Sequence, residues 1–164
     1  MELRKRIDLR YVFIGVYILA FLVYIIYGLR PIDAVHSEGI SGSIEIPAIG
    51  LSSGVTRIEL EGNKLPTPEK IVGSYSSNPN NTLLIGHEAT IFKDLKNVEL
   101  GDKVVYDDST YKVNDIRIIE KDQINMRDVL AEKDETTLSI MTCAGTSLGG
   151  GDATHRLIVT AVQE

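Results

Sequence analysis

Three side chains of this sequence could together perform nucleophilic catalysis: His87, Cys143 and Arg156. Cys143 is the only cysteine among 164 residues, so it cannot form a disulfide within the chain. A thiolate that attacks a carbonyl needs a proton acceptor, which histidine supplies, and a donor that stabilises the oxyanion, which arginine supplies. Each side chain also has an ordinary alternative role: a buried cysteine, a hydrogen-bonded histidine or a surface arginine.

All three residues lie at the ends of segments that we expect to form strands. The last two of these segments are rich in β-branched residues, which is typical of strands. Arg156 comes 13 residues after Cys143, so antiparallel pairing of their strands would bring the two together. The segments are 82–85, which precedes Gly86 and His87, then 136–142 before Cys143, and 156–162, which Arg156 begins.

From residue 43 onward the chain is typical of short strands and turns. Further strands are expected at 43–49, 55–60, 103–106 and 111–120, the last two as a hairpin across the turn at 107–109. A helical turn is expected at 91–95 and a brief helix at 125–132, with Asp122 or Asn125 as its cap, whereas 62–79 is expected to be mostly loop. This pattern predicts a mainly β domain, either a closed barrel or a sandwich.

Near the N-terminus, residues 11–29 form a run of 19 residues without a charge. As a helix this run would be roughly 28 Å long, close to the ~30 Å hydrocarbon core of a bilayer. It predicts one transmembrane helix, retained because Arg30-Pro31-Ile32-Asp33 follows instead of a small-residue cleavage site. A buried core helix is the alternative interpretation.

The charges that flank this run predict its orientation. Four basic residues precede it, which places 1–10 in the cytoplasm and the rest of the chain, a linker at 30–42 and a domain at 43–164, outside. We therefore expect a single-pass protein of the cell membrane. The part after Leu29 has 13 basic and 21 acidic residues, a net charge of −8, which argues against nucleic acid as a partner.

The short segments around the three candidate residues resemble the sequence motifs of the sortase family. Ser139-Ile140-Met141-Thr142-Cys143 resembles the family's TLxTC signature, with Ser139 in place of the first threonine. The other matching words are Ile85-Gly86-His87, Phe92 and Leu95 with Leu100-Gly101-Asp102 after it, His155-Arg156-Leu157-Ile158-Val159, and Ile46-Pro47-Ala48-Ile49. The resemblance spans roughly residues 44–162, and the order His, Cys, Arg is that of the family.

This resemblance implies a closed eight-stranded β-barrel with short helices and the activity of a cysteine transpeptidase. Such an enzyme cleaves an LPxTG-like sorting signal of a surface protein through a thioacyl intermediate and passes the protein to an amine, such as that of a peptidoglycan precursor. By the same resemblance, Cys143 is the nucleophile, His87 the general acid/base and Arg156 the group that holds substrate and stabilises the oxyanion. Thr142 and Ala144, which flank the cysteine, are expected to bind substrate.

Alternatives remain open for this function. A pilin-polymerising sortase is one, although the chain ends at Glu164 without a second apolar segment and its linker resembles no lid, which favours cell-wall anchoring. A non-enzymatic, membrane-tethered β-domain, such as an adhesin or a sensor module, is another. An L,D-transpeptidase would need a His and a Gly just before its Cys and an Arg just after, and Cys143 has neither.

We expect no cofactor and no metal. With three His and one Cys the chain has no set of zinc ligands. Loop carboxylates could hold a calcium ion, but such side chains are usually solvated; they are Glu88, Asp94, Glu99, Asp107 and Asp108. His155 is the only other candidate base, but its neighbour Arg156 would oppose its protonation, and His36 lies in the linker.

Overall fold

The computed structural model describes residues 39–62 and 64–164. The predicted transmembrane helix at 11–29, the predicted cytoplasmic residues 1–10 and most of the predicted linker lie outside the described residues. Among the helices of the described ranges, none is long and apolar enough to cross a membrane.

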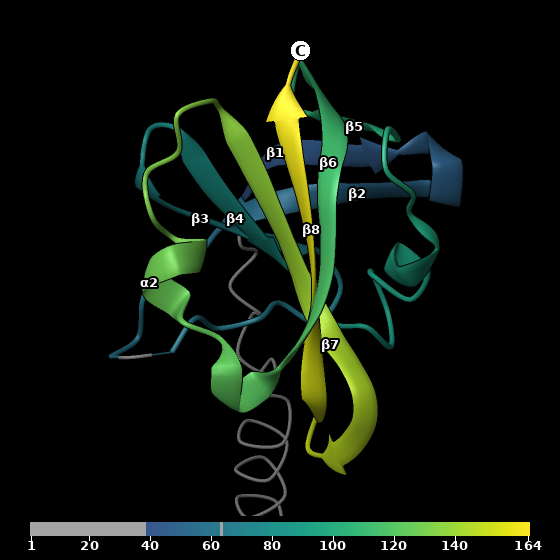
Figure 1. The fold of residues 1–164 in the computed structure, drawn as a ribbon, viewed down its shortest axis with the longest axis vertical. Coiled ribbons are helices and arrows are strands. Elements are labelled where there is room, and N and C mark those ends of the chain that lie inside the picture. The colour runs from purple at the N-terminus through teal and green to yellow at the C-terminus, as the bar shows by residue number, and fades with distance from the viewer. Residues whose placement is uncertain (1–38, 63) are drawn as a thin grey trace, which may run out of the picture. The chain divides into compact units, whose positions relative to one another are not determined.

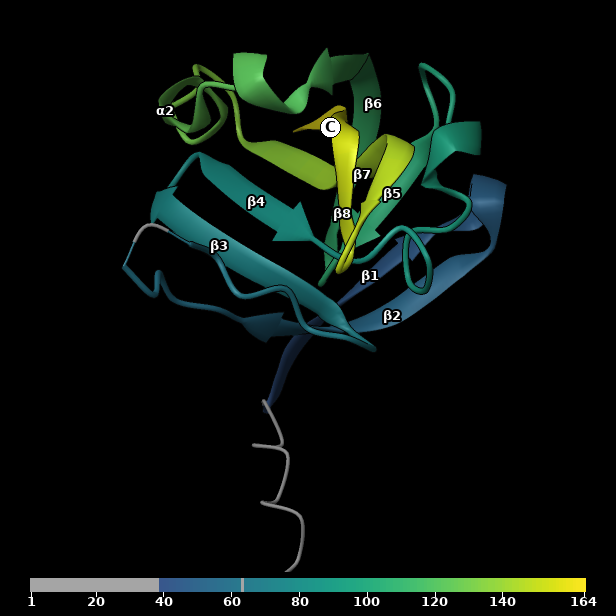
Figure 2. The same cartoon turned by 90° about the horizontal axis from the view of Figure 1, so that it is seen from below.

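Eight strands close into a barrel, which confirms the predicted fold class (Figures 1 and 2). Around the barrel their order is β1-β2-β3-β4-β7-β8-β6-β5, and β5 pairs with β1 to close it. The strands are β1 (Ile40–Ile46), β2 (Leu51–Arg57), β3 (Val72–Asn78), β4 (Asn81–Ile85), β5 (Lys103–Tyr106), β6 (Ser109–Glu120), β7 (Thr137–Gly149) and β8 (Asp152–Gln163).

The described helices are short and lie in the connections. They are the 3-10 helices η1 (Pro47–Ile49), η2 (Leu95–Asn97) and η3 (Lys121–Gln123) and the α-helix α2 (Met126–Val129). α2 lies inside the helix predicted at 125–132, and its cap is Asn125, whose side chain accepts a bond of 3.1 Å from the amide of Arg127. η3 and α2 both belong to the connection from β6 to β7.

The barrel interior is an apolar core to which most strands contribute. Alternate residues of each strand point inward, as the period of two requires, so Leu138 and Ile140 of β7 are buried beside Leu84 of β4 and Val159 of β8. A second apolar cluster lies on the outer face: Leu83 and Ile85 of β4 with Ile58, packed by Leu65, Tyr75, Met126, Val129, Leu130 and Met141. The connection that carries α2 therefore covers the outer face of β4 and β7 (Figure 2).

The prediction of loop at 62–79 was wrong for its second half, because β3 occupies Val72–Asn78. Its sequence VGSYSSN shows little strand propensity, but β2 pairs with it in parallel and β4 in antiparallel orientation. The buried hydroxyl of Ser74 donates to the carbonyl of Thr56, so a polar residue is satisfied inside the sheet. Pairing with two neighbours thus outweighs local propensity.

The boundaries of β1, β2, β7 and β8 also differ from those predicted. β1 begins at Ile40, inside the predicted linker at 30–42, and β2 runs Leu51–Arg57 rather than 55–60. β7 and β8 extend as a hairpin beyond the segments predicted at 136–142 and 156–162, so Cys143 and Arg156 lie within strands rather than at their ends. Figure 1 shows this hairpin, in yellow-green and yellow, reaching past the other strands.

Candidate active site

Cys143 and Arg156 are direct partners in the antiparallel register of β7 and β8, as the sequence predicted for these two segments. The neighbouring pair, Thr142 and Leu157, is buried in the barrel wall. Because successive residues of a strand point to opposite faces, Cys143 and Arg156 both point to the outer face of the barrel.

His87 reaches the same face from β4. β4 runs parallel to β7 with Ile85 opposite Met141, so continuing this register by two residues brings His87 level with Cys143. A hydrogen bond links the residues that precede Cys143 and His87: the Thr142 hydroxyl donates to the carbonyl of Gly86 over 2.8 Å. The two strand segments are therefore joined immediately before their reactive side chains.

The close packing of Phe92 leaves room only for a glycine before His87. A Cβ at Gly86 would lie 2.9 Å from two ring atoms of Phe92, whose side chain is 1% exposed. The amide of Phe92 donates to the His87 carbonyl over 3.0 Å, and that of Thr90 does so over 3.2 Å. The turn after β4 is thus held in place by the buried Phe92. These contacts fix the backbone of His87 and so the position from which its imidazole extends.

The turn between β7 and β8 contacts the thiol. The Cys143 thiol lies 3.5 Å from the Gly151 carbonyl oxygen, and a Cβ built on Gly151 would lie 4.0 Å from the Cε1 atom of His87. Gly151 has a φ of 79°, a left-handed conformation that glycine adopts without strain. The Gly151 backbone therefore lies close to both reactive side chains.

His87, Cys143 and Arg156 all line one cleft of about 320 Å³. This volume is in the range of small-ligand pockets. The lining has an apolar part and a polar part, and the polar part consists of the three residues with Thr67, Thr142 and the backbone of Gly86 and Gly151. The apolar part comes from β4, β7, the β2–β3 connection and the α2 region: Leu60, Leu65, Ile85, Met126, Leu130 and Met141.

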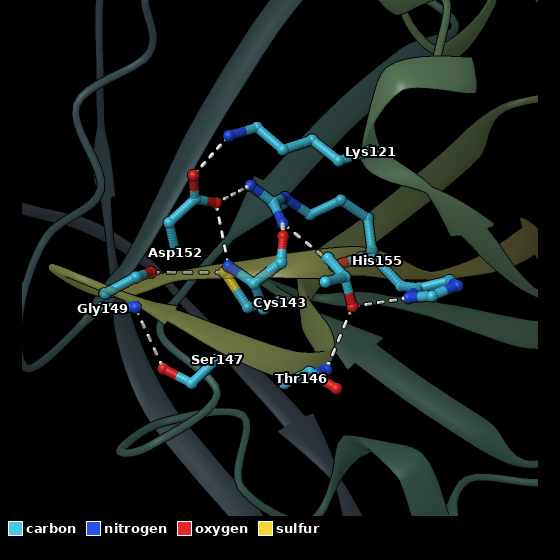
Figure 3. A network of polar contacts seen from close by, with 11 residues as sticks. Lys121, Cys143, Thr146, Ser147, Gly149, Asp152 and His155 are labelled. Carbon is cyan, nitrogen blue, oxygen red and sulfur yellow. Dashed lines mark hydrogen bonds and ion pairs between the residues drawn. The ribbon is translucent and has the colours of Figure 1, made fainter.

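Arg156 is held by an acidic residue that the sequence motifs did not indicate. Its Nη2 atom lies 2.6 Å from Oδ1 of Asp152, and its Nη1 atom donates to the carbonyls of Ala153 and His155 over 2.9 Å each. The other carboxylate oxygen of Asp152 pairs with Lys121 (Figure 3). Hydrogen bonds from Lys121 and Arg156 hold the pKa of the Asp152 carboxyl well below its usual range. In the sequence, only the i, i+4 spacing of Asp152 and Arg156 could have suggested this ion pair.

The remaining predicted residues lie in different places. Thr142 lines the cleft and is 4% exposed. Ala144 packs against the barrel core and is not among the described residues that line the cleft. His155 lies opposite Ala144, bonds through Nδ1 to the Thr154 hydroxyl over 2.8 Å, and lines a separate cavity with Glu120, Lys121 and Asp122.

The described residues contain no group of three or more His, Cys, Asp or Glu side chains placed to hold a metal ion. No such group is formed by the described loop carboxylates Glu88, Asp94, Glu99, Asp107 and Asp108. The side chains with reactive groups that line the cleft are Cys143, His87 and Arg156.

Several solved structures that share this fold are sortases. Sortase A from Listeria monocytogenes superposes with a TM-score of 0.59 at 20% identity, over 76% of this chain and 87% of that one. A lid mutant of sortase A from Corynebacterium diphtheriae gives 0.62 at 21%, over 76% and 70%. Sortase C1 from Streptococcus agalactiae gives 0.60 at 26%, over 80% and 70%.

Among curated proteins no sequence matches this chain. The family model described as "Sortase domain" matches residues 44–164, which include the whole cleft and every strand from β2 to β8. This match covers well over half of the sequence, and the chain therefore belongs to the sortase family of transpeptidases.

Proposed function

We propose that this protein is a cysteine transpeptidase that cleaves an LPxTG-like sorting signal and transfers the acyl part to an amine. The observation that carries the proposal is the placement of Cys143 between two partners, with Arg156 opposite it on β8 and His87 level with it after β4. All three groups open into one cleft, so a bound peptide could meet them together.

The proposed reaction has two halves that share one site. In the first half, the Cys143 thiolate attacks the scissile carbonyl, Arg156 donates to the oxyanion, and the His87 imidazolium protonates the departing amine. The peptide bond breaks and a thioester forms. In the second half, neutral His87 takes a proton from the incoming amine, which displaces the thiolate and forms a new amide bond. After both halves, Cys143 is again a thiolate and His87 again an imidazolium, so the enzyme is regenerated and no redox step is needed.

The shape of the cleft supports a peptide as substrate. Its apolar part, which Ile85 and Met141 line, would accept the Leu and Pro side chains that open such a motif. The polar part of the lining would then receive the scissile carbonyl beside Cys143. The Thr142 hydroxyl already donates to the Gly86 carbonyl, so the contribution of Thr142 to substrate binding would be through its backbone.

The proposal includes the location of the reaction. The uncharged run at 11–29 would hold the domain at the outer face of the cell membrane, where both substrates, a secreted surface protein and a lipid-linked cell-wall precursor, are delivered. A peptidoglycan precursor amine is the proposed acceptor.

Pilin polymerisation is the second candidate, because several similar structures are sortases C. One is described as sortase C1 of a group B Streptococcus pilus island and is 23% identical over 75% of this chain. The two functions differ in the acceptor, which would be the side-chain amine of a pilin lysine in polymerisation and a peptidoglycan stem amine in anchoring.

A peptide-library assay tests the proposal. The full chain in mild detergent is incubated with LPxTG-like peptides and either a stem-peptide amine or a lysine-containing pilin peptide, and products are identified by mass spectrometry. We expect cleavage between Thr and Gly and a new amide to one acceptor. His87→Ala should abolish turnover, whereas His155→Ala, which alters a histidine outside the cleft, should retain it. Cleavage of no peptide, or equal loss in both variants, would contradict the proposal and favour a non-enzymatic β-domain.

A further inference from the structure

The guanidinium of Arg156 is only partly occupied by its partners in the described part of the chain. An arginine has five N–H donors. Both Nη1 donors are used by the carbonyls of Ala153 and His155, and one Nη2 donor is used by Asp152. The Nε donor and one Nη2 donor remain for a ligand in the cleft that Arg156 lines. A planar group with these contacts has a fixed orientation, so the direction of the free donors is fixed as well.

Asp152 is itself held from several sides. Its Oδ1 atom accepts from the Ala153 amide over 2.9 Å as well as from Arg156, and its other oxygen pairs with Lys121 (Figure 3). Lys121 belongs to η3, in the connection that continues through α2 and supplies Met126 and Leu130 to the cleft. The ion pair of Asp152 with Lys121 therefore joins the first residue of β8 to the start of that connection.

We propose that Asp152 is the positioning residue of Arg156, which it orients through its ion pair so that the free donors face the scissile carbonyl, with Lys121 fixing the Asp152 carboxylate. This inference rests on the proposed function. The trio carries a net charge of +1, so the anchoring does not neutralise the end of the cleft where an oxyanion would form. The low pKa of Asp152 keeps its carboxylate ionised throughout the neutral range.

A direct effect of Asp152 on the other reactive groups is the competing explanation. Its side chain is 36% exposed and also lines a small cavity of about 110 Å³ with His87 and Cys143. Acting there, its charge would change the protonation of the imidazole or the thiol. Acting through Arg156, it would leave thiol protonation unchanged and matter only while Arg156 is present.

These two explanations are separated by a double-mutant cycle in the full chain. Asp152→Ala should lower kcat/KM for a sorting peptide by about 10-fold to 100-fold, the scale on which a misplaced catalytic group acts. In the Arg156→Lys background the same change should cost less than about twofold, because the planar fork to be oriented is gone. The pH midpoint of Cys143 alkylation by iodoacetamide should stay unchanged. Asp152→Asn, which keeps an oxygen acceptor at the same place, should lie between Ala and wild type.

Asp115→Ala is the matched control. Asp115 also pairs with an arginine, Arg117, with 2.7 Å between its Oδ2 and Nε, but the pair lies on β6 and lines a different cavity. We expect this variant to keep the wild-type kcat/KM, and circular dichroism of both variants checks the fold.

Several outcomes would overturn the inference. They are a wild-type rate in Asp152→Ala, an equal loss with and without Arg156, and a shifted alkylation midpoint, which would assign Asp152 to the direct role. If wild type cleaves no sorting peptide, the proposed function fails first, and the Arg156 Nε–H resonance then tests the positioning alone. That resonance should broaden or shift in Asp152→Ala and stay in place in Asp115→Ala. An unchanged resonance in Asp152→Ala would overturn the inference.

Discussion

Arg156 stands directly opposite Cys143 in the register of β7 and β8, and its guanidinium is tied to the backbone of its own strand. The distance from the thiol to the donor fork is therefore set by a sheet ladder and not by a mobile loop. Sites built on strands are held more precisely than sites on loops. Because of this fixed geometry, a substitution can test whether the guanidinium of Arg156 is needed or any positive charge is enough.

Replacement of Arg156 by lysine separates charge from geometry. A lysine keeps the positive charge but cannot donate to Asp152, two carbonyls and a ligand from one rigid plane. Loss of one oxyanion donor typically costs about 10²–10³ in rate. We expect Arg156→Lys to lower kcat/KM by about two orders of magnitude or more in a fluorogenic sorting-peptide assay. A rate within about threefold of wild type would leave Arg156 a purely electrostatic role.

The hydrogen bond from Thr142 to Gly86 should align the two reactive strands. Thr142→Val keeps the shape of the side chain but removes the buried donor, and the Gly86 carbonyl loses its partner. An unpaired buried polar group costs about 1–3 kcal/mol, which should appear in the free energy of unfolding measured with denaturant. Thr142→Ser keeps the hydroxyl and is the control. Equal stability of the Val and Ser variants would show that this bond contributes nothing.

The three side chains selected from short sequence motifs, His87, Cys143 and Arg156, line one cleft. The pairing of β7 with β8 could be predicted because both segments have high strand propensity and are close in sequence. The sequence did not indicate β3, whose polar sequence becomes a strand through its two neighbours. Nor did it indicate the contacts of Asp152 with Arg156 and Lys121, since Lys121 lies 31 residues away in sequence. The apolar wall of the cleft likewise comes from connections whose positions depend on the folded barrel.

The depressed pKa of the Asp152 carboxyl predicts how its ion pairs respond to acid. Because the folded pKa lies below the unfolded value of about 3.9, the stabilisation is fully present above that value and is lost as the pH falls through the folded pKa. The difference in unfolding free energy between wild type and Asp152→Asn should therefore be constant from about pH 5 to pH 8 and shrink only in stronger acid. Asp122→Asn, an exposed acid outside this network, serves as control. A difference that disappears already near pH 6 would contradict the assignment.

Removal of residues 1–29 should leave a soluble and folded domain. The buried core residues of the described barrel lie between Ile44 and Ala161, so the deletion removes none of them. We expect the shortened chain to unfold cooperatively in a thermal melt and to cleave the same sorting peptide as the full chain. An insoluble or unfolded product would show that the N-terminal residues contribute to the fold.

The most direct test of the proposed chemistry is intact-mass spectrometry of the full chain, quenched in acid during reaction with a sorting peptide and no amine acceptor. We predict a species heavier by the acyl part of the peptide without its leaving group, mapped by proteolysis to Cys143 and released by hydroxylamine. Cys143→Ala should fold normally, because one small residue replaces another at a partly buried position of β7. It should form no acyl adduct, because the thiol is absent. An adduct on another residue, or cleavage of the peptide by Cys143→Ala at the wild-type rate, would contradict a thioacyl mechanism at this cysteine.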